Sequence, residues 1–212
     1  MHIVSINCST GKTVIWKGKP VRTSIFKTPV AGRINIGKLN VEGDLQSDLR
    51  VHGGPDKAVY SYDLQDYVWW REELKSELSP GGFGENLTTE GLSDHEVCVG
   101  DILKAGSAVL QAVQPRLPCY KLAVKFQDDL MPKRFMKAGR WGIYFRVLEE
   151  GAVEAGDSIQ LVSSEPQRVR IADLAQIFTG AVTDRTLIRR ALAIPSLVES
   201  WRNTLLEMEF QK

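Results

Sequence analysis

The sequence contains little cysteine. Its 212 residues include three, Cys8, Cys98 and Cys119, and no two of them form a C-x-x-C pair. A disulfide framework needs paired cysteines, and a structural zinc site needs closely spaced ligands, so the sequence predicts neither. Cys8 and Cys98 belong to strand-like segments and are expected to be packed or solvated thiols. Any chemistry by cysteine must therefore come from a single thiol in an activating environment.

The sequence also lacks an excess of charge of either sign and any long apolar run. Lys and Arg number 27 against 26 Asp and Glu, which leaves a formal net charge of +1. Such a chain has no overall field that attracts nucleic acid or an anionic membrane, so an anion site must be built locally. No apolar run approaches the ~20 residues of a membrane helix, and residues 1–7 resemble a first strand rather than a leader. These absences predict a cytoplasmic protein without a membrane or nucleic-acid partner.

Glycine separates short β-branched segments over residues 1–160, a texture typical of many strands. The expected strands are residues 3–6, 13–16, 23–26, 59–62, 108–113 and 142–148. A longer helix is expected from its N-cap Asp63 to residue 78, with shorter helices from Pro118 and over 129–138. Residues 97–103 resemble residues 153–159, since each has a Gly-Asp turn between strand-like runs. This echo indicates a barrel with two related halves.

The texture changes after residues 165–166. Apolar residues at helical spacing follow in three groups, at residues 171–178, 187–192 and 196–208. Ser196 and Glu199 form a capping-box pattern ahead of the third group. Helices this short must pack on one another or on the main domain. The sequence therefore predicts a β-rich domain over residues 1–165 and a three-helix segment over residues 166–212.

Cys119 is the one cysteine in a setting that favours a reactive thiolate. It lies in Gln-Pro-Arg-Leu-Pro-Cys-Tyr-Lys-Leu at residues 114–122. If Pro118 opens a helix, Cys119 lies in its first turn, where backbone N–H groups stabilise negative charge; Arg116 and Lys121 add positive charge. A thiolate is both a nucleophile and a soft metal ligand. A buried cysteine that only fills space fits the same local pattern.

Three further segments offer groups for an anion or a planar ligand, and each also has a purely structural interpretation. His52 precedes a two-glycine turn whose N–H groups can bind an anion, although a hairpin turn with a surface histidine has the same sequence. Asn86 follows a glycine-rich loop whose spacing matches no nucleotide-binding motif. Thr23 and Lys27 supply a hydroxyl and a cation that suit a phosphate ester, and they equally suit an exposed edge strand.

Taken together, these segments resemble the MOSC domain family, specifically its YiiM-type branch. The matching stretches are residues 39–44, 51–58, 83–87, 99–101 and 114–122. The cysteine stretch is specific in combination with His-Gly-Gly-Pro-Asp-Lys at residues 52–57, and the C-terminal helices extend the resemblance over essentially the whole chain. The resemblance favours a functional role for Cys119 over simple packing.

The resemblance implies a mainly β fold, with a β-barrel-like MOSC domain, a few helices and a C-terminal three-helix segment. It implies binding of the molybdenum cofactor in its molybdopterin form, with Cys119 as metal ligand and catalytic residue. It also implies a molybdenum-dependent oxidoreductase that reduces N-hydroxylated compounds such as hydroxylaminopurines. An external reductase would supply the electrons, because the sequence has no iron–sulfur, flavin or haem motif. Candidate cofactor-binding residues are Thr23, Lys27 and Arg116 for the phosphate, His52 and Asn86 for the pterin or the substrate rim, and Lys121.

Two other functions fit the same residues. Cys119 can hold a persulfide, as in a sulfur carrier related to molybdenum-cofactor sulfurases, or the domain can store and deliver the cofactor without turnover. A sulfur carrier would show a labile sulfur adduct on Cys119 without bound metal, whereas a storage module would bind pterin and reduce no substrate. The C-terminal helices are expected to close the domain or to form a homodimer.

Overall fold

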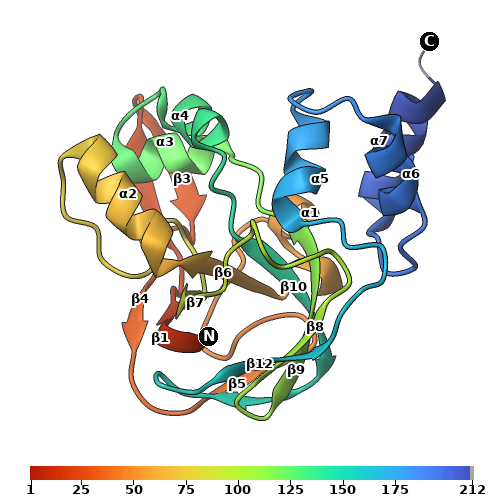
Figure 1. The fold of residues 1–212 in the computed structure, drawn as a ribbon. Helices are drawn as coiled ribbons and strands as arrows, with labels where there is room; N and C mark the ends of the chain where they lie inside the picture. Colours follow the sequence, from red (N-terminus) through yellow and green to blue (C-terminus); the bar gives the residue numbers. More distant parts are fainter. Residues whose placement is uncertain (211–212) are drawn as a thin grey trace.

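An eight-stranded mixed sheet forms the centre of the structure, a computed structural model that describes residues 1–210 except for the side chains of residues 50 and 51 (Figure 1). Its order is β12-β8-β9-β10-β6-β7-β1-β4, with β6 and β7 parallel and the other neighbours antiparallel. Two smaller sheets pair β2 with β3 and β5 with β11. The strands are β1 (His2–Cys8), β2 (Lys12–Trp16), β3 (Lys19–Thr23), β4 (Thr28–Val30), β5 (Ile34–Ile36), β6 (Val59–Asp63), β7 (Leu87–Glu90), β8 (Ile102–Ala105), β9 (Ala108–Pro115), β10 (Ile143–Glu149), β11 (Gly151–Val153) and β12 (Ile159–Ser163).

The large sheet curls, but its strand order stays open. Its edge strands are β12 and β4, and an isolated bridge between His2 and Ser158 brings the start of β1 against the residue before β12. The prediction of a mainly β fold with a few helices is confirmed. A closed barrel is not found among residues 1–210.

The two similar sequence segments form the same local turn. In Gly100–Asp101 and in Gly156–Asp157 the glycine has a positive φ, 94° and 95°, which other residues rarely adopt. Each aspartate carboxylate accepts the backbone N–H three residues earlier, from Cys98 at 2.9 Å and from Glu154 at 2.8 Å. The following strands, β8 and β12, pair with each other. The echo is therefore one turn used twice, and it does not mark two halves of a barrel.

The neighbouring strands β9 and β10 show why this part of the chain forms a sheet. Alternate residues are buried on both strands, and Leu110 and Ala112 face Val147 and Phe145 across the pair. A period of two places every second side chain on the core face of a strand. Because β9 ends at Pro115, the loop that carries Cys119 leaves from this end of the sheet.

A group of helices packs on an aromatic cluster at one side of the sheet (Figure 1). These helices are α2 (Leu64–Leu74), α3 (Tyr120–Phe126) and α4 (Met131–Ala138). Two short helices, α1 (Leu49–His52) and the 3-10 helix η1 (Pro55–Lys57), lie in the segment before β6. Asp63 caps α2 as predicted, accepting the N–H of Gln65 at 2.8 Å. The helix ends earlier than expected, because Lys75 adopts a left-handed φ of 51°.

Two expectations close to the predicted site are wrong. Helix α3 begins at Tyr120 with Cys119 at its N-cap, so Pro118 lies before the helix rather than in its first turn. Strand β3 ends at Thr23, and the next residues are irregular where a strand over residues 23–26 was expected. The physical reason is that Ser24 and Lys27 bind side chains of another loop, at residues 44–47, instead of a neighbouring strand.

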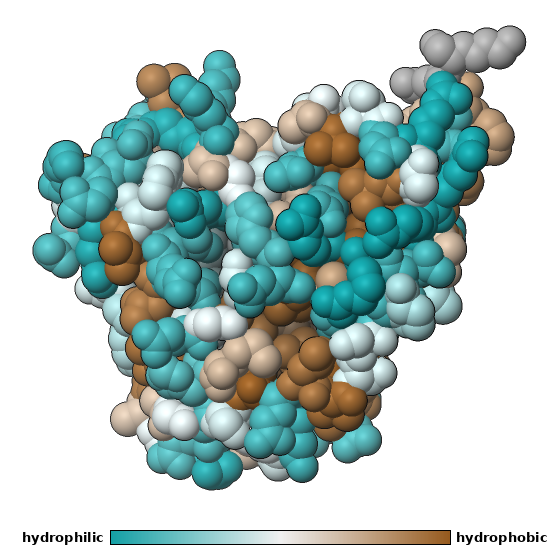
Figure 2. All heavy atoms as spheres, in the orientation of Figure 1, coloured by the Kyte–Doolittle hydropathy of each residue, from teal (hydrophilic) through white to brown (hydrophobic). Residues whose placement is uncertain are grey.

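Three C-terminal helices follow the sheet, as predicted, at the opposite side from α2 to α4 (Figure 1). They are α5 (Ile171–Phe178), α6 (Arg185–Leu192) and α7 (Glu199–Phe210). Most of their buried apolar residues, Leu174 and Leu205 among them, belong to the same hydrophobic cluster as the central strands, while Ala172 and Ala175 of α5 belong to the aromatic cluster. The Ser196 capping box is wrong, because α7 begins only at Glu199 and the Ser196 hydroxyl has no hydrogen-bond partner. Hydrophobic atoms also reach the surface over these helices (Figure 2).

None of the helices within residues 1–210 is both long and apolar enough to cross a membrane.

Candidate functional site

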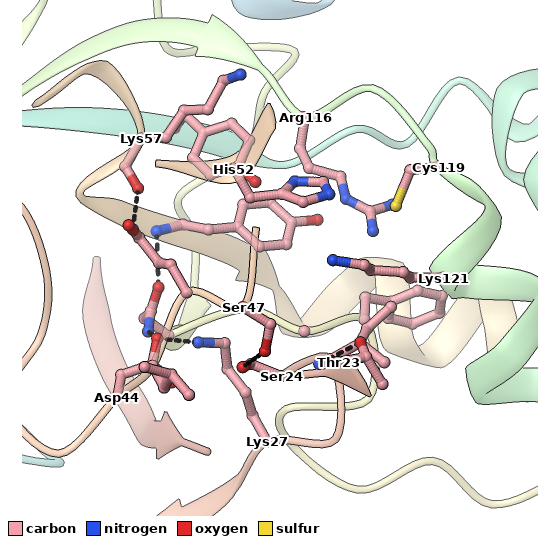
Figure 3. Close-up of a pocket in the computed structure, with 18 residues that line it drawn as sticks. Thr23, Ser24, Lys27, Asp44, Ser47, His52, Lys57, Arg116, Cys119 and Lys121 are labelled. Atoms are coloured by element: carbon pink, nitrogen blue, oxygen red, sulfur yellow. Dashed lines mark hydrogen bonds and ion pairs between the residues drawn. The ribbon is translucent and has the colours of Figure 1, made fainter. Parts of the chain in front are cut away.

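One cavity collects every residue that the sequence singled out. It measures about 560 Å³, counting the open solvent at its mouth, and segments far apart in the chain line it (Figure 3). The predicted residues on its wall are Thr23, Lys27, His52, Asn86, Arg116, Cys119 and Lys121. The structure therefore brings together all seven.

The sheet and its loops place these side chains. Thr23 ends β3, His52 ends α1, and Asn86 immediately precedes β7. Arg116 directly follows β9, and Cys119 is the N-cap of α3. Because β6, β7, β9 and β10 lie in one sheet, the loops that leave their ends meet around one space.

Arg116 is a buried cation with an unused hydrogen-bond donor. Its residue is 5% exposed, and its Nη1 atom has no hydrogen-bond partner. The guanidinium carbon lies 5.1 Å from the ring centroid of Phe135 and 5.8 Å from that of Tyr60. Aromatic faces attract a cation, but they do not replace the hydrogen bonds that a buried guanidinium loses. An anionic ligand would supply them.

Lys121 adds a second buried cation to the same region. It is 7% exposed, and across the described part of the chain neither Lys121 nor Arg116 forms an ion pair with a carboxylate. Figure 3 shows the Arg116 guanidinium beside the Cys119 sulfur, with the Lys121 amine and the His52 ring extending into the same cavity. Buried charges are normally paired, so this concentration of positive charge indicates a site for negative charge.

The pKa of His52 is affected by this positive charge. Burial, and after it the charges of the cations Lys121, Arg116 and Lys57, together lower the pKa of His52 from 6.5 to about 4. The imidazole is therefore neutral at neutral pH and has one donor and one acceptor nitrogen. It can bind a ligand through hydrogen bonds without adding a charge.

Cys119 differs from the other two cysteines in its surroundings. Its thiol is half-buried on the cavity wall and is not used to cap α3. By contrast, burial and the charge of Asp44 raise the pKa of Cys8 to about 11, and burial raises the pKa of Cys98. Cys8 and Cys98 are packed thiols, the first of the two alternatives that the sequence left open.

Two family models match this chain, one in its β-rich part and one in its C-terminal helices. Residues 48–160 match the family model of the MOSC domain, and residues 171–208 match that of the YiiM-like 3-alpha helix domain. The chain belongs to the MOSC domain family. The resemblance drawn from the motifs is thereby confirmed, whereas the boundary between residues 1–165 and 166–212 stays a prediction.

Relatives of this MOSC protein align over nearly its whole length. Protein YflK of Bacillus subtilis is 40% identical over 97% of this chain and 93% of its own. Protein YiiM of Escherichia coli is 34% identical over 94% of this chain and 90% of its own. The crystal structure of YiiM from Geobacillus stearothermophilus superposes with a TM-score of 0.81 at 36% identity, covering 98% of both chains. A protein of Gibberella moniliformis named "Reductase" is 32% identical over 84% of this chain, which spans only 32% of that longer protein.

Three of the predicted residues use their polar groups in contacts within the protein itself. Lys27 forms an ion pair with Asp44, and the Asn86 amide donates to the same carboxylate at 2.9 Å. The Thr23 hydroxyl is fully buried and accepts the N–H of Ile25 at 3.2 Å. These contacts hold the cavity wall in place, and a role for the three residues in binding a cofactor stays a prediction.

Several side chains that line the cavity were not among the predicted residues. Asp44 is central, because it binds both Lys27 and Asn86, and the hydroxyls of Ser24 and Ser47 bond to each other across the cavity rim. Tyr144 comes from β10, and burial raises its pKa to about 12, so it keeps its proton. The stretch at residues 39–44 was a usable signal for Asp44. No motif around Tyr144 indicates that it lines the cavity, because in the sequence it is one aromatic residue within a strand.

Proposed function

We propose that this MOSC domain binds the molybdenum cofactor in its molybdopterin form, with the Cys119 thiolate as metal ligand. We further propose that the loaded protein reduces N-hydroxylated compounds of the hydroxylaminopurine type. The observation that carries the proposal is the pair of buried, unpaired cations, Arg116 and Lys121, beside the half-buried thiol of Cys119. Positive charge suits a phosphate group, and a thiolate suits a soft metal.

The residues present fit such a cofactor. Within residues 1–210 no group of three His, Cys, Asp or Glu side chains could hold a metal ion. A metal at Cys119 would therefore depend on ligands that arrive with it, and the dithiolene sulfurs of a pterin are such ligands. MOSC domains resemble the C-terminal domain of molybdenum-cofactor sulfurases, and this resemblance supports binding of the same cofactor here.

Once bound, the cofactor supplies the two-electron redox chemistry. The chain supplies position and charge. Arg116 and Lys121 bind and neutralise the anionic part of the cofactor, and the Cys119 sulfur fixes the metal end. The neutral His52 imidazole and the protonated Tyr144 hydroxyl both line the cavity and offer hydrogen bonds without charge. A separate reductase provides the electrons, and the name of the longer Gibberella relative supports a reductive role.

The test is metal analysis of protein from a host that makes the cofactor. Wild-type protein should carry close to one molybdenum per chain by inductively coupled plasma mass spectrometry, and Cys119→Ser should carry almost none. Cys98→Ala is the matched control, because Cys98 is a buried thiol outside the cavity. The loaded protein should then reduce 6-hydroxylaminopurine to adenine with a chemical electron donor.

Two outcomes would contradict the proposal. Molybdenum retained in Cys119→Ser would remove the cysteine as ligand. An empty wild-type protein, from a host in which a known molybdoenzyme is fully loaded, would remove the cofactor, and a labile sulfur adduct on Cys119 would then favour the sulfur carrier.

A further inference from the structure

A second cavity adjoins the first at Cys119. It measures about 790 Å³, counting the solvent at its mouth, and its lining shares His52, Lys57, Cys119 and Tyr144 with the first cavity. Half of the remaining wall has a different origin, because four of its eight residues come from the C-terminal helices α5 and α7 and the other four from the end of β9 and the loop that follows it. Cys119 thus lies on the boundary between a cavity built by the sheet and its loops and a cavity completed by the three-helix segment.

The walls of the second cavity are mostly apolar. Phe178 of α5 and Trp201 of α7 contact each other edge to face, with ring centroids 5.3 Å apart and planes at 61°. Leu117 and Pro118 of the loop before Cys119 contribute further apolar surface, and the hydroxyl-bearing residue Thr204 of α7 adds a polar group. Aromatic walls with few polar groups favour a flat, uncharged ring system.

A chain of hydrogen bonds holds the aromatic wall against the first cavity. The Trp201 indole N–H donates to the side-chain oxygen of Gln114 at 2.9 Å, and the Gln114 amide donates to the backbone carbonyl of Asp56 at 2.9 Å. Asp56 belongs to η1, the turn that follows His52. Because both Gln114 bonds are internal, Trp201 has a fixed position and does not need to be ordered when a ligand binds.

The two cavities therefore differ in the ligand that each can hold. The first contains the unpaired cations Arg116 and Lys121, whereas neither of these lines the second, which shares the cation Lys57 with the first. An anionic cofactor fits the first, and a neutral aromatic ring fits the second. A ligand in each would meet at Cys119, the position where the proposed function places the metal.

We propose that the second cavity is the substrate subsite, and that it selects planar heteroaromatic N-hydroxylated compounds over non-aromatic ones through Phe178 and Trp201. This inference rests on the proposed function for the identity of the reaction, but the binding preference follows from the cavity alone. It gives the C-terminal three-helix segment a specific role, as the wall that determines the class of substrate.

The experiment measures binding directly, with 6-hydroxylaminopurine as the probe and hydroxyurea as a probe without a ring. Protein labelled with 5-fluorotryptophan has five tryptophan resonances, and Trp201→Phe identifies that of Trp201. Titration with 6-hydroxylaminopurine, of both cofactor-free and loaded protein, should shift the Trp201 resonance in at least one form. Hydroxyurea should leave it unchanged.

A pair of variants then tests the aromatic wall. Phe178→Ala should weaken 6-hydroxylaminopurine binding about three- to tenfold, the usual loss when one aromatic contact is removed, while molybdenum content stays the same. Phe178 is 39% exposed, so the substitution is expected to leave the fold intact. Phe210→Ala is the matched control, because Phe210 is 78% exposed on α7 and does not line the cavity.

The outcomes separate this inference from the proposed function. A Trp201 resonance that stays fixed in both forms at saturating ligand, or equal affinity of Phe178→Ala and Phe210→Ala, would overturn the substrate subsite even if molybdenum is bound. A shifted Trp201 resonance in a protein that never binds molybdenum would instead support the ring-binding subsite and reject the proposed reaction.

Discussion

Two regions of this MOSC domain bury charge in opposite ways. Under α2 the carboxylate of Glu85 is fully buried, and donors surround it. It accepts hydrogen bonds from the Tyr67 and Thr88 hydroxyls and from the backbone N–H groups of Gly81 and Phe83, with lengths of 2.7 Å from Thr88, 2.7 Å from Gly81 and 3.1 Å from Phe83. The chain itself satisfies this charge.

The cavity beside Cys119 shows the reverse. Arg116 keeps an unused donor, and Lys121 forms no ion pair with any residue that the structure describes. Leaving a buried charge unsatisfied costs free energy, so a folded protein keeps one only where something other than stability is selected. The contrast teaches how to separate a structural charge from a functional one. The surrounded carboxylate serves the fold, whereas the bare cations are available to a ligand.

The largest expected effect comes from breaking the satisfied region. Glu85→Leu should lower the free energy of unfolding by about 3–5 kcal/mol, because it leaves two backbone N–H groups and two hydroxyls without their acceptor. Urea denaturation followed by circular dichroism measures this. Glu90→Gln, an exposed substitution on β7, should change stability by less than about 0.5 kcal/mol. Equal stability of the two variants would show that the carboxylate network does not support the fold.

The next effect is a pH dependence of stability, caused by the burial of His52 and by the cations beside it. The folded pKa of His52 is about 4 against 6.5 for a free histidine. The unfolded chain therefore binds a proton over this range while the folded chain does not, and stability falls as pH drops from 6.5 to 4, by about 2–3 kcal/mol. Below pH 4 this contribution stays constant. His52→Gln should remove this slope in denaturation curves measured at several pH values, and parallel profiles for both proteins would contradict the assignment.

Removing a bare cation should cost binding rather than stability. Arg116→Met should change the free energy of unfolding of the cofactor-free protein by no more than about 1 kcal/mol, because a buried unpaired charge is replaced by an apolar chain of similar length. Its molybdenum content should nevertheless fall at least tenfold. Lys104→Met, an exposed substitution on β8, is the control for the loss of one positive charge. A large loss of stability with full metal content would place Arg116 among the structural charges.

The smallest expected effect is a change in the pKa of His52 on phosphate binding, and measuring it requires no mutation. Inorganic phosphate bound near Arg116 and Lys121 would offset their field, so the pKa of His52 should rise above its value of about 4. The titration of the imidazole by NMR, with and without phosphate, measures this change. An unchanged His52 titration at saturating phosphate would show that the anion binds elsewhere.

The local pattern of the sequence was sufficient for much of the candidate site. The proline-flanked stretch around Cys119, between Arg116 and Lys121, marked the thiol because those residues are close neighbours in the chain. The C-terminal helices were equally readable, since helical periodicity is a local property. The start of α3 was misplaced by two residues, because a proline at residue 118 suits the first helical turn and also the segment before a helix.

Contacts between residues far apart in the chain could not be predicted from the sequence. Lys27 looked like a ligand for phosphate, but its partner is Asp44, and only the folded chain shows that this carboxylate also binds Asn86. The echo of two Gly-Asp turns suggested a barrel, because a turn repeats locally while the order of strands depends on pairing across the whole chain.

By itself, then, the sequence determined which thiol and which cations have unusual neighbours, and that a helical segment follows a β-rich one. Only the tertiary structure decided which of those charges remain unpaired, and that Phe178 and Trp201 complete a second cavity at Cys119. The physical reason is that periodicity and adjacency are set within a few residues, whereas pairing and cavity shape depend on side chains that meet only after the sheet and the C-terminal helices have packed.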